Sequence, residues 1–503
     1  MGNNQVKWGV ILSYLTIILN TLYGLIITPY LISTLGDAEY GVYKTIASFA
    51  ATLTIMDMGL GSTMMRYVAK YQASGQEDKI PNFAAMTLAQ AAVMGGAIIV
   101  VSGGLYFTIR PTYAATFTEI QIQKAQLLFV LLIINMVIHL FQNVLNGIIT
   151  GSNQFVFGKG LGVIRLLLRT VLLVALLQVF NNSSVIVLID IGLSVAFITA
   201  DAIYIKKKLN VRIKLTKFEK SVFLESGKYS LLMFLSAIET QINSNLDNVL
   251  IGSIRGPGFV AVYSMGLLIF GMFQNLSVGV SGVMLPTITN AVERGTKDEL
   301  HRLIIRSGRL QFALMGAALV GFVCIGKDFL LLWLGEGFSD VYIITLLLIC
   351  ASVLELCVNT CISVLRAKNK MGFYITASTA GTIANAITTY FAVKYWSYLG
   401  AAVCTAVTFF IARVVVMGVY YVKRHGIPIL SIYKGIFDRI WLCLLLAGAG
   451  LWLFSRFCSG SLWSFVAGIA VFAVIYGVSM LFYGLSKEEK KLIRIGGNKK
   501  WLM

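Results

Sequence analysis

A polar stripe interrupts an apolar stretch of the chain, ETQINSNLDNVLIGSIR, at residues 239–255. Glu239, Asn243 and Asp247 recur every four residues, so a helix would place all three on one face. Ionisable side chains are costly in hydrocarbon and usually face a protein interior or a water-filled path. We interpret the stripe as a candidate ion-coupling site. The alternative is a hydrogen-bonded network that only fixes helix packing.

Two further polar stripes follow helical spacing. The stripe within residues 122–150 comprises Asn135, His139, Gln142, Asn143 and Asn146, and that within residues 340–365 and just beyond comprises Ser352, Glu355, Asn359, Ser363 and Arg366. Lipid-facing polarity is expensive, so we expect both faces to line an interior shared by two lobes. The amides could instead bond neighbouring helices. His139 and Glu355 are predicted to lie in a water-accessible cavity.

Two arginines lie in a predicted helical hairpin centred near Asn182. Arg165 falls at the depth of Asp201, which predicts a structural salt bridge. Arg169, one turn deeper, has only Ala196 opposite. We therefore predict that Arg169 has no partner within the hairpin and is available to an anionic ligand.

A third arginine, Arg413, lies roughly ten residues before Lys423, or about 15 Å along a helix. This depth is too great for a simple anchor at the membrane surface. Arg66, Arg306 and Arg366 lie near the ends of predicted spans, where snorkelling accounts for them.

The composition places these elements in a membrane, since 57% of the 503 residues are hydrophobic and 13% are charged. Average soluble domains are about a quarter charged. About fourteen apolar runs are long enough to span a bilayer, at roughly 20 residues each. The first is not followed by a cleavage site, so we expect a span and no removable signal peptide. The predicted spans are 10–34, 40–65, 81–108, 122–150, 157–180, 185–205, 229–254, 259–290, 303–326, 340–365, 371–393, 398–422, 433–456 and 461–485.

The formal charge of +19 is concentrated in alternate loops. By the positive-inside rule these loops are cytoplasmic, which places both termini inside and requires an even number of spans. The basic segments are 66–70, 206–228, 293–309, 366–370, 423–424 and 487–500.

Several classes of function are not supported. The basic residues flank spans and form no domain of their own, so topology and lipid contact explain them and no nucleic-acid partner is predicted. There is no nucleotide-binding G-x-x-x-x-G-K-[ST] loop, no CxxC pair and only three histidines, so no cofactor or metal is expected. The longest outer stretches, 110–121 and 327–340, are short, which argues against a glycan polymerase or ligase.

The two halves of the chain resemble each other. An offset of 220 residues pairs Gly36 with Gly256 and Tyr43 with Tyr263, and an offset of 216 pairs Asn143 with Asn359 and His139 with Glu355. Both halves start on the same side, so the repeat is parallel. The acidic stripe is not shared, because its counterpart positions are Leu19, Tyr23 and Ile27.

We therefore predict an all-α polytopic membrane protein with two six-helix lobes and two extra helices. The expected divisions are a first lobe at 1–205, a basic cytoplasmic linker at 206–228, a second lobe at 229–422, and two helices with a basic tail at 423–503. The linker could be an amphipathic surface segment or a solvated tether.

Three segments resemble a known family: TLGDAEYGVY (34–43), DMGLGSTMMRYVAKY (57–71) and PTITNAVERGTKDEL (286–300). They are similar to the polysaccharide transporter branch of the multidrug/oligosaccharidyl-lipid/polysaccharide exporter superfamily, the O-antigen and capsule repeat-unit flippases. The similarity covers essentially the whole chain. It implies a V-shaped pair of lobes that moves an undecaprenyl-pyrophosphate-linked oligosaccharide to the outer leaflet of a bacterial cytoplasmic (inner) membrane by alternating access. Glycan polymerases and glycosyltransferases of the same pathway would be its partners.

The resemblance also implies roles for the polar residues. Unpaired cations would neutralise the pyrophosphate, amides would bind the sugars, and acidic or histidine side chains would couple transport to H⁺ or Na⁺. The candidates are Arg66, Arg169, Arg255 and Arg413 for pyrophosphate, Asn143 and Asn359 for sugar, and Asp57, His139, Glu239, Asn243, Asp247 and Glu355 for the ion. The alternatives are a lipid II flippase and a drug or cation antiporter of the same superfamily, the latter typically with twelve spans.

Overall fold

A computed structural model describes residues 2–53, 59–216, 218, 241, 244–294, 297–368, 370–457, 462–486 and 489–490. Across these residues the regular structure is entirely helical. Ten of the described helices are long and apolar enough to cross a membrane, or eleven if a bent helix pair counts as one span. The prediction of an all-α polytopic membrane protein is confirmed. The expected number of about fourteen spans is close to this count, since several predicted spans are broken or lie partly outside the described residues.

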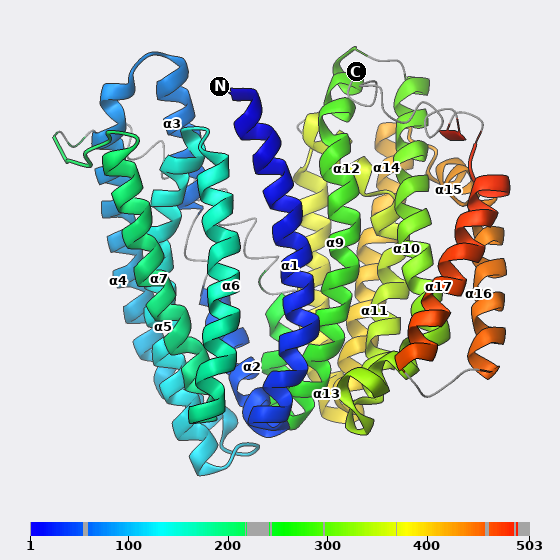
Figure 1. The fold of residues 1–503 in the computed structure, drawn as a ribbon, viewed down its shortest axis with the longest axis horizontal. Helices are drawn as coiled ribbons and strands as arrows, with labels where there is room; N and C mark the ends of the chain where they lie inside the picture. Colours follow the sequence, from blue (N-terminus) through cyan, green and yellow to red (C-terminus); the bar gives the residue numbers. More distant parts are fainter. Residues whose placement is uncertain are drawn as a thin grey trace. The chain divides into compact units, whose positions relative to one another are not determined.

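The chain forms two compact units, residues 1–261 and 262–503. Unit 1 holds the first seven helices (Figure 1) and a helical segment at 244–254. The seven are α1 (Gly2–Leu35), α2 (Asp37–Ala51), α3 (Leu60–Ala73), α4 (Ile80–Tyr113), α5 (Glu119–Gly151), α6 (Phe155–Phe180) and α7 (Ser183–Lys207).

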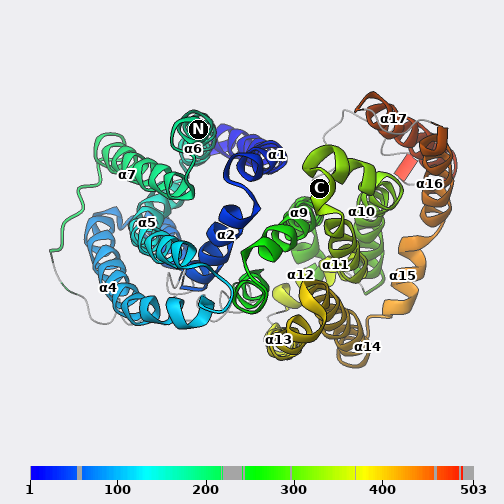
Figure 2. The ribbon, with the colours of Figure 1, turned by 90° about the horizontal axis from the view of Figure 1, so that it is seen from below.

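Helix α5 is the centre of unit 1. It packs against α2, α3, α4 and α7. Figure 2 shows α2, α4 and α7 around it. A capping box starts the helix, in which the Thr118 hydroxyl accepts from the backbone N–H of Gln121 and the Gln121 side chain accepts from that of Thr118. Gly147 lets α3 approach closely, because a Cβ there would lie 2.5 Å from the carbonyl oxygen of Gly61. This close contact holds α5 against α3.

The predicted hairpin around Asn182 is present. Asn181 ends α6 with a φ of 35° and a ψ of 50°, in the left-handed region. Asn182 then caps α7, since its side-chain oxygen accepts from the backbone N–H of Ser184. Helix α1 packs along α6 on its other side. The hairpin thus carries the arginines of α6 between α1 and α7.

Unit 2 begins at Val262, inside α9. It is built around α10, which packs against α11, α15 and α16. In Figure 2, α16 and α17 lie together at the edge of the unit. Its helices are α9 (Pro257–Arg294), α10 (Lys297–Leu334), α11 (Asp340–Cys357), α12 (Asn359–Ala367), α13 (Gly372–Phe409), the π-helical η4 (Phe410–Val416), α14 (Met417–His425), α15 (Ile429–Phe437), α16 (Ile440–Phe457), α17 (Leu462–Ser479) and the π-helical η5 (Met480–Gly484).

Three predicted spans are not continuous helices in the described residues. The expected span 433–456 is divided at the bend between α15, which ends at Phe437, and α16, which begins at Ile440. The expected span 40–65 is divided, because α2 ends at Ala51 and α3 begins only after Gly59, whose φ of 62° is left-handed. The expected span 340–365 is interrupted at Val358 between α11 and α12. Hydropathy does not detect the breaks at Gly59 and Val358, since the residues around them are as apolar as the helices they separate.

Candidate functional site

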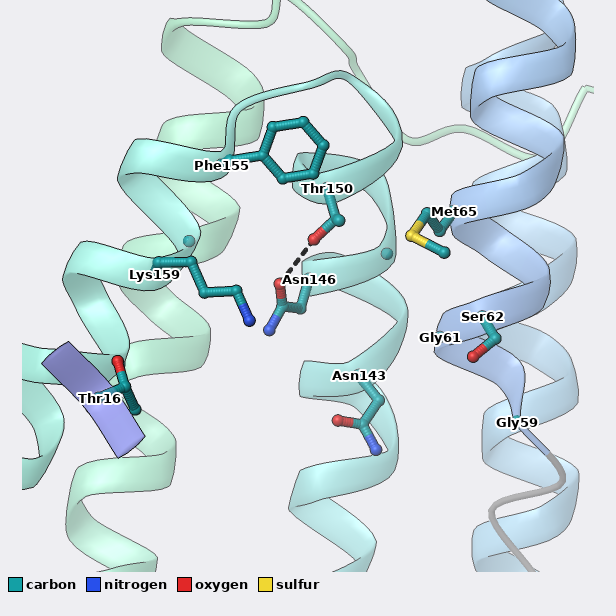
Figure 3. Close-up of a pocket in the computed structure, with 13 residues that line it drawn as sticks. Thr16, Gly59, Gly61, Ser62, Met65, Asn143, Asn146, Thr150, Phe155 and Lys159 are labelled. Carbon is teal, nitrogen blue, oxygen red and sulfur yellow. Dashed lines mark hydrogen bonds between the residues drawn. The ribbon is translucent and has the colours of Figure 1, made fainter. Parts of the chain in front are cut away.

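A cavity of about 530 Å³ lies within unit 1 between α1, α3, α5 and α6 (Figure 3). Its polar side chains come from all four of these helices: Thr16 of α1, Ser62 of α3, Asn143, Asn146 and Thr150 of α5, and Lys159 of α6. Five glycines also line it and keep its walls free of bulky side chains. The cavity thus combines open space with hydrogen-bonding groups and one cation.

The polar groups of this cavity are arranged around Asn146. Thr150 Oγ1 donates to Asn146 Oδ1 at 3.2 Å, which leaves the amide NH₂ of Asn146 to serve as a donor. Figure 3 shows the exposed Lys159 side chain extending from α6 toward Asn146. Amides and hydroxyls bind sugar hydroxyls in both senses, and a lysine ammonium binds phosphate as a point charge. The predicted sugar ligand Asn143 lies in this cavity.

A smaller cavity of about 170 Å³ adjoins the first and shares Asn143 and Asn146 with it. It extends along α5 to His139 and Gln142 and is also lined by Arg165 and Asp201. Four residues of the stripe predicted on residues 122–150, namely His139, Gln142, Asn143 and Asn146, therefore line a cavity of unit 1. An interior shared by two lobes stays a prediction.

The predicted direct salt bridge between Arg165 and Asp201 is wrong. Arg165 donates to Gln142 Oε1 at 3.0 Å and to Ser194 Oγ at 2.8 Å, and its Nη2 lies 3.2 Å from His139 Nε2. Gln142, Arg165 and Asp201 line the same small cavity. Arg165 therefore binds groups of α5 and α7 and makes no direct ion pair with Asp201.

The prediction that Arg169 has no partner within the hairpin is also wrong. Arg169 Nε lies 2.5 Å from Asp190 Oδ1, and Nη2 donates to Asp190 Oδ2 at 2.9 Å. Its third nitrogen, Nη1, donates to the Tyr23 hydroxyl of α1 at 2.6 Å. Matching residues by backbone depth missed Asp190 because it lies six residues from Ala196, or roughly one and a half helical turns, and a long guanidinium side chain can reach that far.

Arg413 was expected to be an unpaired cation, and this too is wrong. In unit 2, Arg413 Nη1 lies 3.3 Å from Glu355 Oε1, so the pair joins η4 to α11. The guanidinium also lies 4.7 Å from the centroid of the Phe409 ring. Glu355 is 9% exposed, so its carboxylate is largely enclosed. The two positions paired by the internal repeat, His139 and Glu355, therefore each contact an arginine of their own unit.

The other predicted site residues are spread over several elements. Arg66 is exposed on α3, Arg255 is half-buried directly after the segment 244–254, and Asn359 is the first residue of α12. Asp247 is 3% exposed. Asp57, Glu239 and Asn243 lie outside the described residues.

Two residues of the site were not found by sequence reasoning. Lys159 follows no helical stripe, although its position between Gly158 and Gly160 near the start of an apolar helix is an available signal. Besides Asp201, the apolar span 185–205 contains one other acidic residue, Asp190. Its position roughly one and a half turns from the level of Arg169 is within the reach of an arginine side chain and is an available signal.

The fold and the cavities define a polytopic helical membrane protein with polar cavities inside its first unit. The sequence profile of a family described as polysaccharide biosynthesis protein matches residues 6–292, and the chain belongs to this family. No curated protein sequence matches the chain.

Solved structures share the fold. A lipid II flippase MurJ in an inward closed conformation has a TM-score of 0.69 at 16% identity, covering 94% of this chain and 97% of that one. An inward-facing multidrug resistance MATE transporter of the MOP superfamily has a TM-score of 0.59 at 15% identity, covering 83% and 99%. A MOP superfamily transporter from Pyrococcus furiosus has a TM-score of 0.55 at 16% identity, covering 84% and 97%. The chain therefore has the fold of the MOP superfamily, as the resemblance implied.

Proposed function

We propose that the protein is a flippase that moves an undecaprenyl-pyrophosphate-linked oligosaccharide from the cytoplasmic to the outer leaflet of a bacterial cytoplasmic membrane. The family relationship supports a role in polysaccharide biosynthesis, and the similarity to a lipid II flippase supports a fold able to carry a lipid-linked glycan. Alternating access of two lobes would expose the cargo site to each side in turn.

The observation that carries this proposal is the chemistry of the unit 1 cavity. Asn143, Asn146, Thr150 and Ser62 offer donors and acceptors together, as sugar hydroxyls require, and Lys159 adds a positive charge among them. A cavity for a lipophilic drug would be lined mainly by apolar and aromatic side chains. Among the described residues that line this cavity, Phe155 is the one aromatic.

The corrected pairings change the proposed ligands of the pyrophosphate. Arg169 and Arg413 each have a carboxylate partner, so we assign them to holding helices together and assign phosphate contact to Lys159. Arg66 and Arg255 stay as further candidate cations. The lipid tail would stay in the bilayer while the charged and sugar groups cross inside the protein.

Transport by this scheme needs a source of energy, and we propose an H⁺ or Na⁺ gradient. Among the described candidates, Asp247 is nearly fully buried, and His139 lies in a cavity beside Arg165. A change in the charge state of such a group between inward- and outward-open forms would link ion movement to cargo movement. Asp57, Glu239, Asn243 and Glu355 belong to the same proposal.

The test in cells is deletion of the gene followed by analysis of lipid-linked intermediates. We expect lipid-linked repeat units to accumulate on the cytoplasmic face and surface glycan to disappear, with wild-type protein restoring both. Accumulation of lipid II would support the lipid II alternative instead. Unchanged surface glycan with no accumulated intermediate would refute the flippase proposal.

A further inference from the structure

A second and larger cavity, of about 710 Å³, lies within unit 2, where α10 meets the α15–α16 bend and the end of η5. Four arginines line it: Arg302, Arg306 and Arg309 of α10, and Arg439 at the bend. The spacing of the first three places them on one face of α10. This concentration of guanidinium groups plays no part in the function proposed for unit 1.

Arg309 holds the walls of this cavity in place. Its Nε lies 3.0 Å from Glu489 Oε1, Nη1 donates to the carbonyl oxygens of Gly435 and Asp438 at 3.2 and 2.9 Å, and Nη2 donates to that of Gly484 at 2.6 Å. Arg309 is 8% exposed. Since all three of its nitrogens are engaged, we treat it as a structural residue that fixes α10, the bend and η5 together.

Arg439 is held in an unusual conformation at the rim. Its φ is 61°, in the left-handed region that non-glycine residues rarely adopt, and it joins α15 to α16, whose axes differ by 44°. Its guanidinium lies 5.7 Å from the centroid of the Tyr483 ring, and its contact with Asp438 is long at 3.7 Å and solvent-exposed. The strained backbone of Arg439 thus occurs at a residue whose guanidinium lines the cavity.

Among the described residues that line the cavity, the arginines outnumber the carboxylates by one. Three carboxylates, those of Glu299, Asp438 and Glu489, line it beside the four arginines. Glu489 is matched by Arg309, which leaves three arginines and two carboxylates among the other described lining residues. A phosphodiester carries one negative charge, whereas a pyrophosphate carries more. The balance therefore suits a phosphodiester.

The position of the cavity also suits a lipid head group. It lies at the end of the candidate span that starts at Asp298 and just beyond the candidate span that ends at Gly484. Basic pockets between spanning helices at the membrane surface bind anionic lipid head groups. We propose that this cavity binds the phosphodiester head group of an anionic phospholipid such as phosphatidylglycerol.

The test is native mass spectrometry of the full chain, purified in detergent, stripped of lipid and titrated with phosphatidylglycerol or phosphatidylethanolamine. The test variant is Arg302→Gln/Arg439→Gln. Its matched control is Lys327→Gln/Arg456→Gln, which removes the same charge at the opposite ends of α10 and α16. The variant Arg302→Lys/Arg439→Lys keeps both positive charges, so normal lipid binding by this variant shows that the charges and not the fold are responsible for the loss. The thermal stability of each variant is a second check on folding. Inorganic phosphate and farnesyl pyrophosphate serve as competitors.

We expect wild-type protein to prefer phosphatidylglycerol over phosphatidylethanolamine. The test variant should bind phosphatidylglycerol roughly thirtyfold more weakly, which corresponds to about 1 kcal/mol for each of the two arginines. The control and the lysine variant should bind like wild type. Equal loss in the control, or no lipid preference in wild type, would refute the proposal. Displacement by inorganic phosphate would identify a free-phosphate site, and displacement by farnesyl pyrophosphate alone would identify a cargo site; either result would overturn the phospholipid assignment.

Discussion

Arg169 of α6 and Asp190 of α7 form a two-pronged ion pair, with Nε to Oδ1 at 2.5 Å and Nη2 to Oδ2 at 2.9 Å. Bidentate pairing of this kind fixes both the distance and the orientation of the two groups. Since the third nitrogen of Arg169 also binds Tyr23, a single side chain joins α1, α6 and α7. The pair therefore holds these three helices of unit 1 together beside the polar cavities.

Asp190→Asn should lower the free energy of unfolding by about 2–4 kcal/mol, because it leaves the Arg169 charge in a largely enclosed site without its partner. Thermal unfolding in detergent measures this. Arg110→Gln, which breaks the exposed pair with Glu119, is the control and should change stability by less than about 0.5 kcal/mol. Equal stability of Asp190→Asn and wild type would show that the pair does not hold the helices.

The Arg413–Glu355 pair should behave as a coupled unit. Arg413→Gln and Glu355→Gln should each destabilise unit 2, because each leaves one charge unmatched, and the double variant should be less destabilised than the sum of the singles. A double-mutant cycle on thermal unfolding should give a coupling of about 1 kcal/mol or more. Strict additivity of the two effects would mean that the residues act independently.

The close approach of α3 and α5 should make Gly147 intolerant of a methyl group. A Cβ at Gly147 would lie 2.5 Å from the Gly61 carbonyl oxygen and 2.8 Å from Met64 Cβ, so Gly147→Ala should cost about 1–3 kcal/mol. Gly96→Ala on α4 is the matched control, since a Cβ there has nothing within 4 Å. Because alanine favours helix, this control should be neutral or stabilising. Similar stability of both variants would contradict the tight packing.

The link between Arg309 and Glu489 should depend on pH. Burial raises the pKa of Glu489, but hydrogen bonds from Arg309 and Ser486 outweigh this and leave the pKa below its usual 4.5. A depressed carboxyl pKa stabilises the fold above the unfolded value, and this stability disappears as pH falls through the folded value. The stability difference between wild type and Glu489→Gln should therefore be constant above about pH 5 and shrink at lower pH.

Thermal unfolding across this pH range measures the difference, with Glu336→Gln as the control. Glu336 is exposed in the short helix η3 (Glu336–Phe338), so its substitution should have no effect that varies with pH. A difference between wild type and Glu489→Gln that grows as pH falls would contradict the assignment.

Much of the fold could be predicted from the sequence, because membrane spans are coded by long apolar runs. Predicted spans 122–150, 157–180 and 185–205 lie within α5, α6 and α7, whose ends are set by capping residues and short turns. The breaks at Gly59 and Val358 could not be predicted, since they depend on local backbone conformation inside apolar sequence.

The site could be predicted only in part. Asn143 and His139 were found because the amide stripe follows the helical period, and the cavities lie along that stripe. The partners of Arg169 and Arg413 were missed because they depend on side-chain reach and on which helices pack together. Lys159 was missed because its role arises from the space left by glycines of α3, α5 and α6.

The most direct test of the flippase account measures transport in proteoliposomes that contain the purified chain and a polyprenyl-pyrophosphate-linked repeat unit. The movement of this lipid between leaflets is followed for wild type, Lys159→Gln, Lys159→Arg and Lys207→Gln. Lys207 is the control, since it is an exposed lysine in the last turn of α7. We predict movement by wild type, a loss of about tenfold or more in Lys159→Gln, partial retention in Lys159→Arg and full activity in Lys207→Gln. Absence of movement in wild type, or movement unchanged by Lys159→Gln, would contradict the account.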